Sequence, residues 1–144
     1  VKFQMIFVGT GPEQQAVEAL VSQYKLEEHV RLLGLRADIA ELMAAADVML
    51  MPSLHEGFPV VLVESQAAGL PAVISDTISK EVDLKVGLVE FISLDDDFGV
   101  WVDKIQAAQF KVKQPLERRI KILEEKGFSV KAGVERLMKV YNII

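Results

Sequence analysis

The sequence of 144 residues contains no cysteine, which excludes disulfide frameworks, thiolate metal sites and cysteine nucleophiles together. Its two histidines, His29 and His55, lack the spacing of metal ligands. Long hydrophobic runs are also missing, and apolar stretches such as Val48 to Met51 are far too short to cross a membrane. From these absences we expect a soluble, cytoplasmic protein without a bound metal.

Standard nucleotide-binding signatures are missing as well. There is no G-x-x-x-x-G-K-S/T sequence, which excludes a standard P-loop. Gly9-Thr-Gly11 follows a strand-like run, but Gln14 occupies the third glycine position of a dinucleotide fingerprint. Gly34-Leu-Arg36 then stands where a ribose-binding acid would follow the second strand, so NAD binding is disfavoured.

The residues that are present are sufficient for a real core, because 51% of the chain is hydrophobic. Short apolar runs alternate with segments of helical spacing. This order predicts an α/β fold, a Rossmann-like three-layer domain with a parallel sheet flanked by helices. The expected strands cover residues 2–8, 30–33, 47–51, 71–75 and 88–93. The expected helices begin near Pro12, Ala37, Pro59, Asp97, Pro115 and Ser129.

The last predicted helix carries a regular apolar stripe, formed by Val130, Val134, Leu137, Met138 and Tyr141. We expect this stripe to pack on the sheet of its own domain. Charge also changes along the chain, because residues 1–110 hold 7 Lys and Arg against 17 Asp and Glu, whereas residues 111–144 hold 9 against 4. The basic part could meet an anionic membrane surface or a phosphate, but solvated faces of surface helices explain it more simply.

The most informative stretch runs from Pro52 to Pro71 and reads P-S-L-H-E-G-F-P-V-V-L-V-E-S-Q-A-A-G-L-P. Glu56-Gly-Phe58 should turn the chain, and a helix should begin at Pro59 and end at Gly69. Amides at such a helix start are unpaired and lie at the positive end of the helix dipole, so anions bind there. Glu64 lies in an otherwise apolar run, and a charge is rarely kept there without a partner, which could be a ligand.

Ligands of open parallel sheets bind outside the carboxyl ends of the strands. Four such ends carry candidate groups, namely Gly9-Thr10-Gly11, Gly34-Leu35-Arg36, Ser53 to Phe58, and Ser75-Asp76. We expect them to converge on one crevice. A diphosphate would be held there by the amides of Phe58, Val60 and Val61, and Gly57 would let it approach the backbone closely. Glu64 would reach ligand hydroxyls one helical turn further on.

The pattern P-S-x-x-E-G-F-P-x-x-L-V-E-x-Q-A-A-G-L-P resembles the nucleotide-sugar signature of the large retaining glycosyltransferase family 4, also called group 1, of the GT-B fold. Phe7-Val-Gly-Thr-Gly-Pro12, Val30-Arg-Leu-Leu-Gly34 and Ala46-Asp-Val48 support the resemblance, which extends from about Phe3 to Ser75. It implies that residues 1–144 are a single nucleotide-sugar-binding domain, the C-terminal half of a GT-B enzyme. The chain opens at Val1 without an initiator methionine, and we expect it to be a piece of a longer, two-domain protein.

The resemblance also implies roles for individual residues. Glu64 would bind the ribose hydroxyls of the donor, Glu56 would be the catalytic residue at a hydroxyl of the transferred sugar, and backbone near Gly34 to Arg36 would bind the base. His55 could act in acid-base chemistry, although a loop histidine is more often incidental. The donor-binding residues would be Gly9, Gly11, Gly34, Leu35, Arg36, Ser53, Gly57, Phe58, Pro59, Val60 and Glu64.

The implied function is transfer of a hexosyl group, with retention, from a UDP- or GDP-sugar to a glycan or lipid-linked acceptor. Neither a metal nor a nucleic acid is implied. Residues 76–84 resemble those of bacterial capsular and exopolysaccharide transferases. The family's N-terminal acceptor-binding domain and its upstream Arg and Lys are missing from this sequence, so we expect the chain alone to be inactive. The complete enzyme could associate peripherally with the inner face of the membrane.

Other functions remain open. A nucleotide-sugar epimerase of the same fold would share the donor site, and a non-catalytic nucleotide-binding module would keep the fold without turnover. Paired carboxylates such as Glu56 and Glu64 also occur in enzymes that hydrolyse glycosidic bonds. We disfavour hydrolysis because hydrolases need no phosphate-binding helix start.

Overall fold

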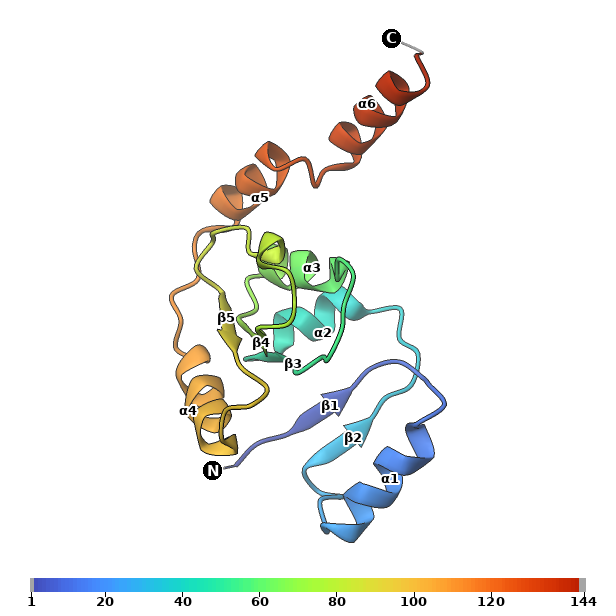
Figure 1. Ribbon diagram of the computed structural model, residues 1–144, viewed down its shortest axis with the longest axis vertical. Coiled ribbons are helices and arrows are strands. Elements are labelled where there is room, and N and C mark those ends of the chain that lie inside the picture. Colours follow the sequence, from blue (N-terminus) through green and yellow to red (C-terminus); the bar gives the residue numbers. More distant parts are fainter. Residues whose placement is uncertain (1, 143–144) are drawn as a thin grey trace. The chain divides into compact units, whose positions relative to one another are not determined.

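The computed structural model of the protein describes residues 2–142. Its elements are β1 (Met5–Phe7), α1 (Gln14–Gln23), β2 (Val30–Leu32), α2 (Ile39–Ala45), β3 (Met49–Met51), α3 (Val60–Ala68), β4 (Ala72–Ser75), the 3-10 helix η1 (Lys80–Val82), β5 (Val89–Ile92), α4 (Phe98–Ala108), α5 (Leu116–Glu125) and α6 (Val130–Val140) (Figure 1). The predicted α/β order is confirmed, with most elements shorter than expected. The chain divides after Ile39 into two compact units.

The first unit contains a two-stranded parallel sheet and α1. Met5 pairs with Val30 and Phe7 pairs with Leu32. In the described part of this unit, Val30 is the one buried hydrophobic residue, and α1 buries none. The unit therefore owes its order mainly to backbone pairing rather than to a core of its own.

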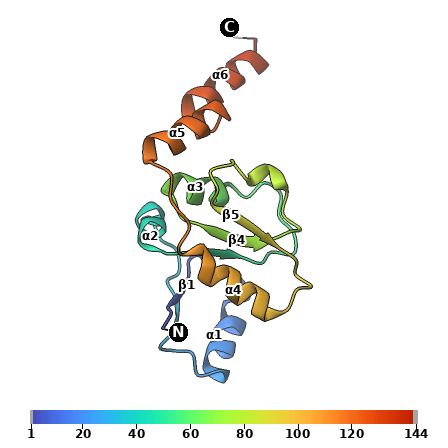
Figure 2. The same ribbon diagram turned by 90° about the vertical axis from the view of Figure 1, so that its left-hand side faces the viewer.

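The second unit contains a three-stranded parallel sheet in the order β3-β4-β5. Every residue of the central strand β4 is buried, as expected for a strand covered on both faces. Ala72 and Ile74 pack with Leu62 of α3, whereas Val73 packs with Trp101 of α4. Figure 2 shows α3 and α4 on opposite faces of this sheet. The predicted three-layer arrangement is confirmed within this unit.

The carboxyl end of α3 is tied to α5. Gly69 ends α3 with a φ of 78°, a left-handed conformation that favours glycine, as the sequence predicted. The buried Arg119 of α5 donates hydrogen bonds to the carbonyl oxygens of Ala67 and Gln114. A Cβ at position 69 would lie 2.7 Å from Nη1 of Arg119, so the glycine also makes room for the guanidinium. The contact with Ala67 thus satisfies a carbonyl that the end of α3 leaves unpaired.

Helix α6 differs from its prediction. Ser129 caps it as expected, because its Oγ accepts from the amide of Ala132 at 3.1 Å. The apolar stripe, however, does not pack on the sheet, since Val130 is 87% exposed and Leu137 is 58% exposed. The physical reason is that α3 and α4 already cover both faces of the β3-β4-β5 sheet. No helix in the described part of the chain is long and apolar enough to cross a membrane.

Candidate functional site

The stretch from Pro52 to Pro71 folds as the predicted strand end, turn and helix. Pro59 is buried and extended, and α3 begins at Val60, one residue later than predicted. The amide of Leu62 donates to the carbonyl of Pro59 at 3.0 Å. Among residues 2–142, the amides of Val60 and Val61 have no backbone acceptor. The helix start therefore offers free donors at the positive end of its dipole.

Glu64 lies on the exposed face of α3, which corrects the expectation that it occupies apolar surroundings. Its neighbours in sequence, Val63 and Ser65, are buried, but Val60, one turn before it, is 59% exposed. The physical reason is the helical period, which puts residues four apart on one face and turns the apolar side of α3 inward. The carboxylate stands beside the helix start without the cost of burial.

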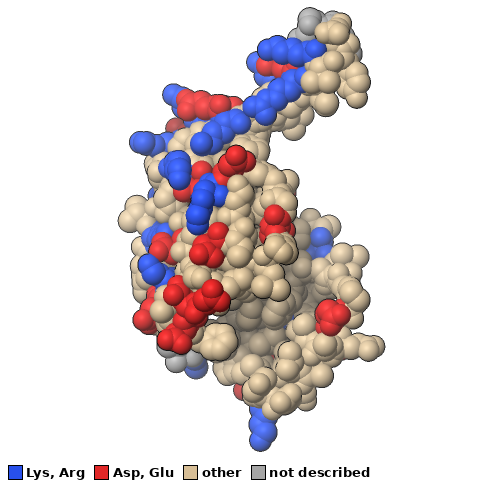
Figure 3. All heavy atoms as spheres, in the orientation of Figure 1, with Lys and Arg blue, Asp and Glu red and all other residues tan. Residues whose placement is uncertain are grey.

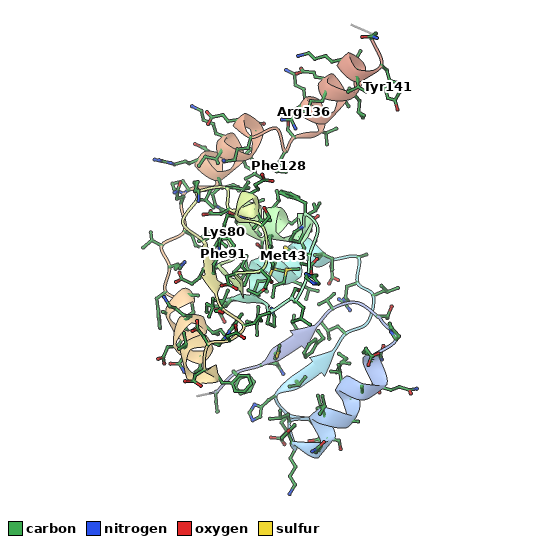
Figure 4. All side chains as sticks on the ribbon, in the orientation of Figure 1. Met43, Lys80, Phe91, Phe128, Arg136 and Tyr141 are labelled. Atoms are coloured by element: carbon green, nitrogen blue, oxygen red, sulfur yellow. The ribbon has the colours of Figure 1, made fainter. Side chains whose placement is uncertain are left out.

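The turn before α3 is open to solvent. Glu56 and Gly57 are exposed, and Phe58 stacks on Phe128 of the α5–α6 connection with ring centroids 5.7 Å apart. Figure 4 marks Phe128 at this junction. Within the described chain, neither Glu56 nor Glu64 forms an ion pair or a side-chain hydrogen bond. Both carboxylates are thus available to a ligand.

Two of the four predicted strand ends are joined in the second unit. The Oγ of Ser75 donates to the carbonyl oxygen of Ser53 at 2.5 Å, and the Oγ1 of Thr77 donates to the same oxygen at 2.8 Å. This contact connects the chain after β3 with the chain after β4. Sequence reasoning missed Thr77, and the available signal was a hydroxyl residue two positions after a buried strand.

The other two strand ends are joined in the first unit. The amide of Gly9 donates to the carbonyl of Gly34 at 2.8 Å, and both glycines have positive φ, 121° and 63°. Residues 7–14, with Val17 and Leu32, line an open hollow of about 270 Å³, and Gly11 is one of these lining residues. Leu35 is 80% exposed. Each unit thus unites two strand ends, and convergence of all four on one crevice stays a prediction.

Arg36 forms an ion pair with Asp38, a carboxylate of the same loop. Its Nε donates to Oδ1 of Asp38 at 2.8 Å and its Nη2 donates to Oδ2 at 2.5 Å. These hydrogen bonds raise the pKa of Arg36 and lower the pKa of Asp38. A phosphate or base that uses this guanidinium must compete with Asp38, so the predicted role of Arg36 in donor binding stays a prediction.

Gln66 is a second polar residue that sequence reasoning missed. Its buried Nε2 donates to the carbonyls of Leu62 and Val82, and its Oε1 accepts from the amide of Leu84. Gln66 thereby ties α3 to the chain that follows β4. The sequence feature that could have indicated this role is a side-chain amide on the inward-facing side of an apolar helix. Lys80 lies 3.6 Å above the ring of Phe91 and fixes η1 to β5 in the same region (Figure 4).

The remaining charges do not gather into a metal centre. Among residues 2–142, no group of three or more Asp, Glu or His side chains is placed to hold a metal ion. Figure 3 shows basic side chains gathered over α5 and α6. The free amides at the start of α3 and these basic side chains are thus the parts of the second unit that attract anions.

Comparison with known proteins gives consistent matches. The model of the family described as glycosyl transferases group 1 matches residues 1–107. EpsF of Bacillus subtilis (strain 168), which is named as a glycosyltransferase, is 41% identical over 143 residues, covering 99% of this chain and 37% of EpsF. Sucrose-phosphate synthase from Thermosynechococcus elongatus has a TM-score of 0.76 at 21% identity, covering 96% of this chain and 38% of that one. Anabaena Alr3699/HepE, solved in complex with UDP, has a TM-score of 0.68 at 22% identity, and the match covers 99% of this chain and 41% of HepE.

The two structural likenesses show the fold, the Rossmann-like α/β arrangement of GT-B glycosyltransferases. Because this chain spans 37% of EpsF, most of that relative lies outside the match. The family model, in contrast, covers well over half of this chain and includes the whole stretch around α3. The chain therefore belongs to the group 1 family of glycosyl transferases.

Proposed function

We propose that this chain is the donor-binding domain of a retaining glycosyltransferase. In the complete protein it would bind a nucleoside diphosphate sugar and present the hexosyl group to a glycan or lipid-linked acceptor. The acceptor would be bound by the other domain, and an Arg and a Lys upstream of this chain would neutralise the diphosphate. The chain alone would then bind donor weakly and transfer no sugar.

The observation that carries this proposal is the start of α3. The free amides of Val60 and Val61 point out of the helix end, Gly57 lacks a side chain that would block approach, and Glu64 stands exposed one turn further on. Nothing within 4 Å would meet a Cβ at Gly57, so the backbone there is open to a ligand. An anion next to hydroxyl groups, such as a nucleoside diphosphate, matches this arrangement.

The proposed roles follow from charge. The amides of α3 would stabilise the negative charge that grows on the diphosphate as the bond to the sugar breaks. Glu64 would accept hydrogen bonds from the ribose hydroxyls, and Glu56 would accept one from a hydroxyl of the sugar. The leaving phosphate would take the proton of the acceptor hydroxyl on the same face, so no protein nucleophile is required.

The choice of nucleotide draws support from the structural likeness. HepE, which shares the fold over 99% of this chain, was solved with UDP. This favours UDP over GDP as the nucleotide of the donor. The 41% identity to EpsF supports transfer of a sugar, and the resemblance of residues 76–84 to capsular and exopolysaccharide transferases favours a role in building a bacterial surface polysaccharide.

Amide hydrogen exchange of the complete protein with UDP, GDP and NAD tests the site. We expect UDP to slow exchange in peptides covering residues 57–64 and 34–36, GDP to act more weakly, and NAD to have no effect. Equal protection by NAD, or protection confined to other segments, would contradict the proposal. Protection by the donor without any sugar transfer would favour the non-catalytic module.

A substitution at Glu64 tests the ribose contact. Glu64→Gln should raise the KM for the donor about 10- to 100-fold, the loss expected for hydrogen bonds made by a charged group. The melting temperature should be unchanged, because Glu64 is exposed and unpaired within the described chain. Glu124→Gln, an exposed glutamate on α5, is the matched control and should leave the KM unaltered. An unchanged KM in Glu64→Gln would remove Glu64 from the donor site.

A further inference from the structure

The turn that carries Glu56 is held at few points. Residues 54–58 are all exposed, and in the described chain none of their amides donates a backbone hydrogen bond. The far end of the turn is fixed by the buried Pro59. The near end is fixed by the carbonyl oxygen of Ser53, which accepts from the hydroxyls of Ser75 and Thr77. Phe58, at the far end, also stacks on Phe128, so the position of the residues directly after Ser53 depends mainly on these two hydroxyls.

The three oxygens form a closed triangle. The Oγ of Ser75 and the Oγ1 of Thr77 lie 2.9 Å apart, in addition to their contacts of 2.5 Å and 2.8 Å with the carbonyl oxygen of Ser53. The three contacts share two hydroxyl protons, because a carbonyl oxygen can only accept a hydrogen bond. Either hydroxyl can thus donate to the carbonyl while the other donates to its neighbour, so each can replace the other in part.

We propose that Ser75 and Thr77 are positioning residues that set where the turn from Ser53 to Phe58 presents Glu56 to the sugar of a bound donor. This inference rests on the proposed function. Ser75 is completely buried at the end of strand β4, so its hydrogen bond fixes the exposed turn relative to the buried sheet. A displacement of about 1 Å at a reacting centre can cost on the order of 100-fold in rate, which makes such a tether matter.

The nucleotide and the sugar should respond differently to loss of the tether. The proposed nucleotide contacts, the amides of α3 and Glu64, lie on a helix that Gln66 and Arg119 hold independently. The sugar contact, Glu56, lies in the turn itself. Loss of the two hydroxyls should therefore lower kcat for sugar transfer while the affinity for UDP stays within about twofold of the parent value, a difference smaller than one ordinary hydrogen bond contributes.

The test compares Ser75→Ala, Thr77→Val and the double variant in the complete protein. We expect each single variant to keep kcat/KM within about threefold, because the remaining hydroxyl still donates to the carbonyl. The double variant should lose about tenfold or more, beyond the product of the two single losses. Thr77→Ser in the Ser75→Ala background restores one donor and should recover the single-variant rate. A merely structural role would not predict this rescue together with unchanged UDP binding.

Backbone NMR relaxation without ligand separates this inference from the proposed function, because the amides of residues 54–58 have no backbone hydrogen bond to lose and only their order can report the tether. In the double variant the order parameters of residues 54–58 should fall, with those of α3 and β4 unchanged. Unchanged order there, or a fully active double variant, would overturn the inference. If the parent protein neither binds UDP nor transfers sugar, the proposed function fails, and the order of residues 54–58 alone decides the tether. If the double variant does not fold, the same order parameters are measured in the two single variants. Loss of one of the two contacts with the Ser53 carbonyl should lower them although kcat/KM stays within about threefold, and no change in either variant overturns the tether.

Discussion

Gln66 shows how one side chain can fix a loop. It makes three hydrogen bonds, to the carbonyls of Leu62 and Val82 and from the amide of Leu84, and it is completely buried. Two of these partners belong to the chain that follows β4. Without Gln66, their polar groups would stay buried and unpaired, which costs more than the hydrogen bonds contribute.

We predict that Gln66→Leu lowers the free energy of unfolding by about 2–4 kcal/mol, because leucine fills the space but leaves the carbonyl of Val82 and the amide of Leu84 unpaired. Urea unfolding measures the loss. Gln106→Leu, at an exposed position of α4, is the control and should change stability by less than about 0.5 kcal/mol. A Gln66→Leu protein as stable as the parent would mean that the loop finds other partners.

The sequence predicted the local backbone of the candidate site better than the surroundings of its side chains. The turn at Gly57, the helix after Pro59 and the glycine stop at Gly69 follow from local backbone rules. The exposure of Glu64 was missed because the surrounding run was interpreted as a uniform apolar environment rather than as a helix with two faces. Thr77 was missed because its partner, the Ser53 carbonyl, lies 24 positions away, and long-range hydrogen bonds leave no local pattern.

At the scale of elements, an ion-pair network joins β5 to α4 and to the chain beyond it. Glu90 of β5 forms two ion pairs. Its Oε1 lies 2.7 Å from Nζ of Lys104 of α4, and its Oε2 lies 3.1 Å from Nζ of Lys111. The hydrogen bond from Lys104 is the main cause that lowers the pKa of Glu90, with a further contribution from Lys111. The same contact raises the pKa of Lys104. Each ion pair of the network therefore stabilises the fold only while Glu90 and its lysine are both charged.

The pH dependence of stability tests this network. Because the folded pKa of Glu90 is lowered, its contribution is present above the unfolded value of about 4.3 and is lost as pH falls through the folded value. Because the folded pKa of Lys104 is raised, its contribution is lost only as pH rises through that value, above about 10.4.

Glu90→Gln should therefore cost about 1 kcal/mol between pH 6 and 9, and the difference from the parent should vanish in strong acid. Chemical unfolding at a series of pH values measures both effects. Asp103→Asn, at an exposed position of α4 without an ion pair in the described chain, should show no such dependence. A cost that stays constant into strong acid would assign the effect to packing rather than charge.

At the scale of the whole molecule, the buried core is distributed unevenly. Apart from Val30, the buried hydrophobic residues of the described chain lie in the second unit, where two of their three clusters include residues of β4. The order of elements could be predicted because each strand and helix has its own periodicity and end signals. The exposure of the α6 stripe could not, because it depends on which sheet faces other helices already cover.

We predict that this uneven core appears as uneven protection. Amide exchange of this chain should be slowest in β4, whose residues are all buried, and faster by about tenfold or more in β1 and β2, since exchange follows the local free energy of opening. Mass spectrometry of peptides from the two units measures the difference. Equal protection of β1 and β4 would show that the first unit gains stability that its own contacts do not supply.

The two faces of α3 have a consequence for how such proteins diversify. Its inward face, with Leu62, Ser65 and Gln66, is buried in the core, whereas Val60 and Glu64 on its outward face are exposed. Selection can therefore alter the outward residues without first losing stability. A library that varies only positions 60 and 64 should stay folded almost throughout, so changes in ligand binding can be measured on an unchanged scaffold.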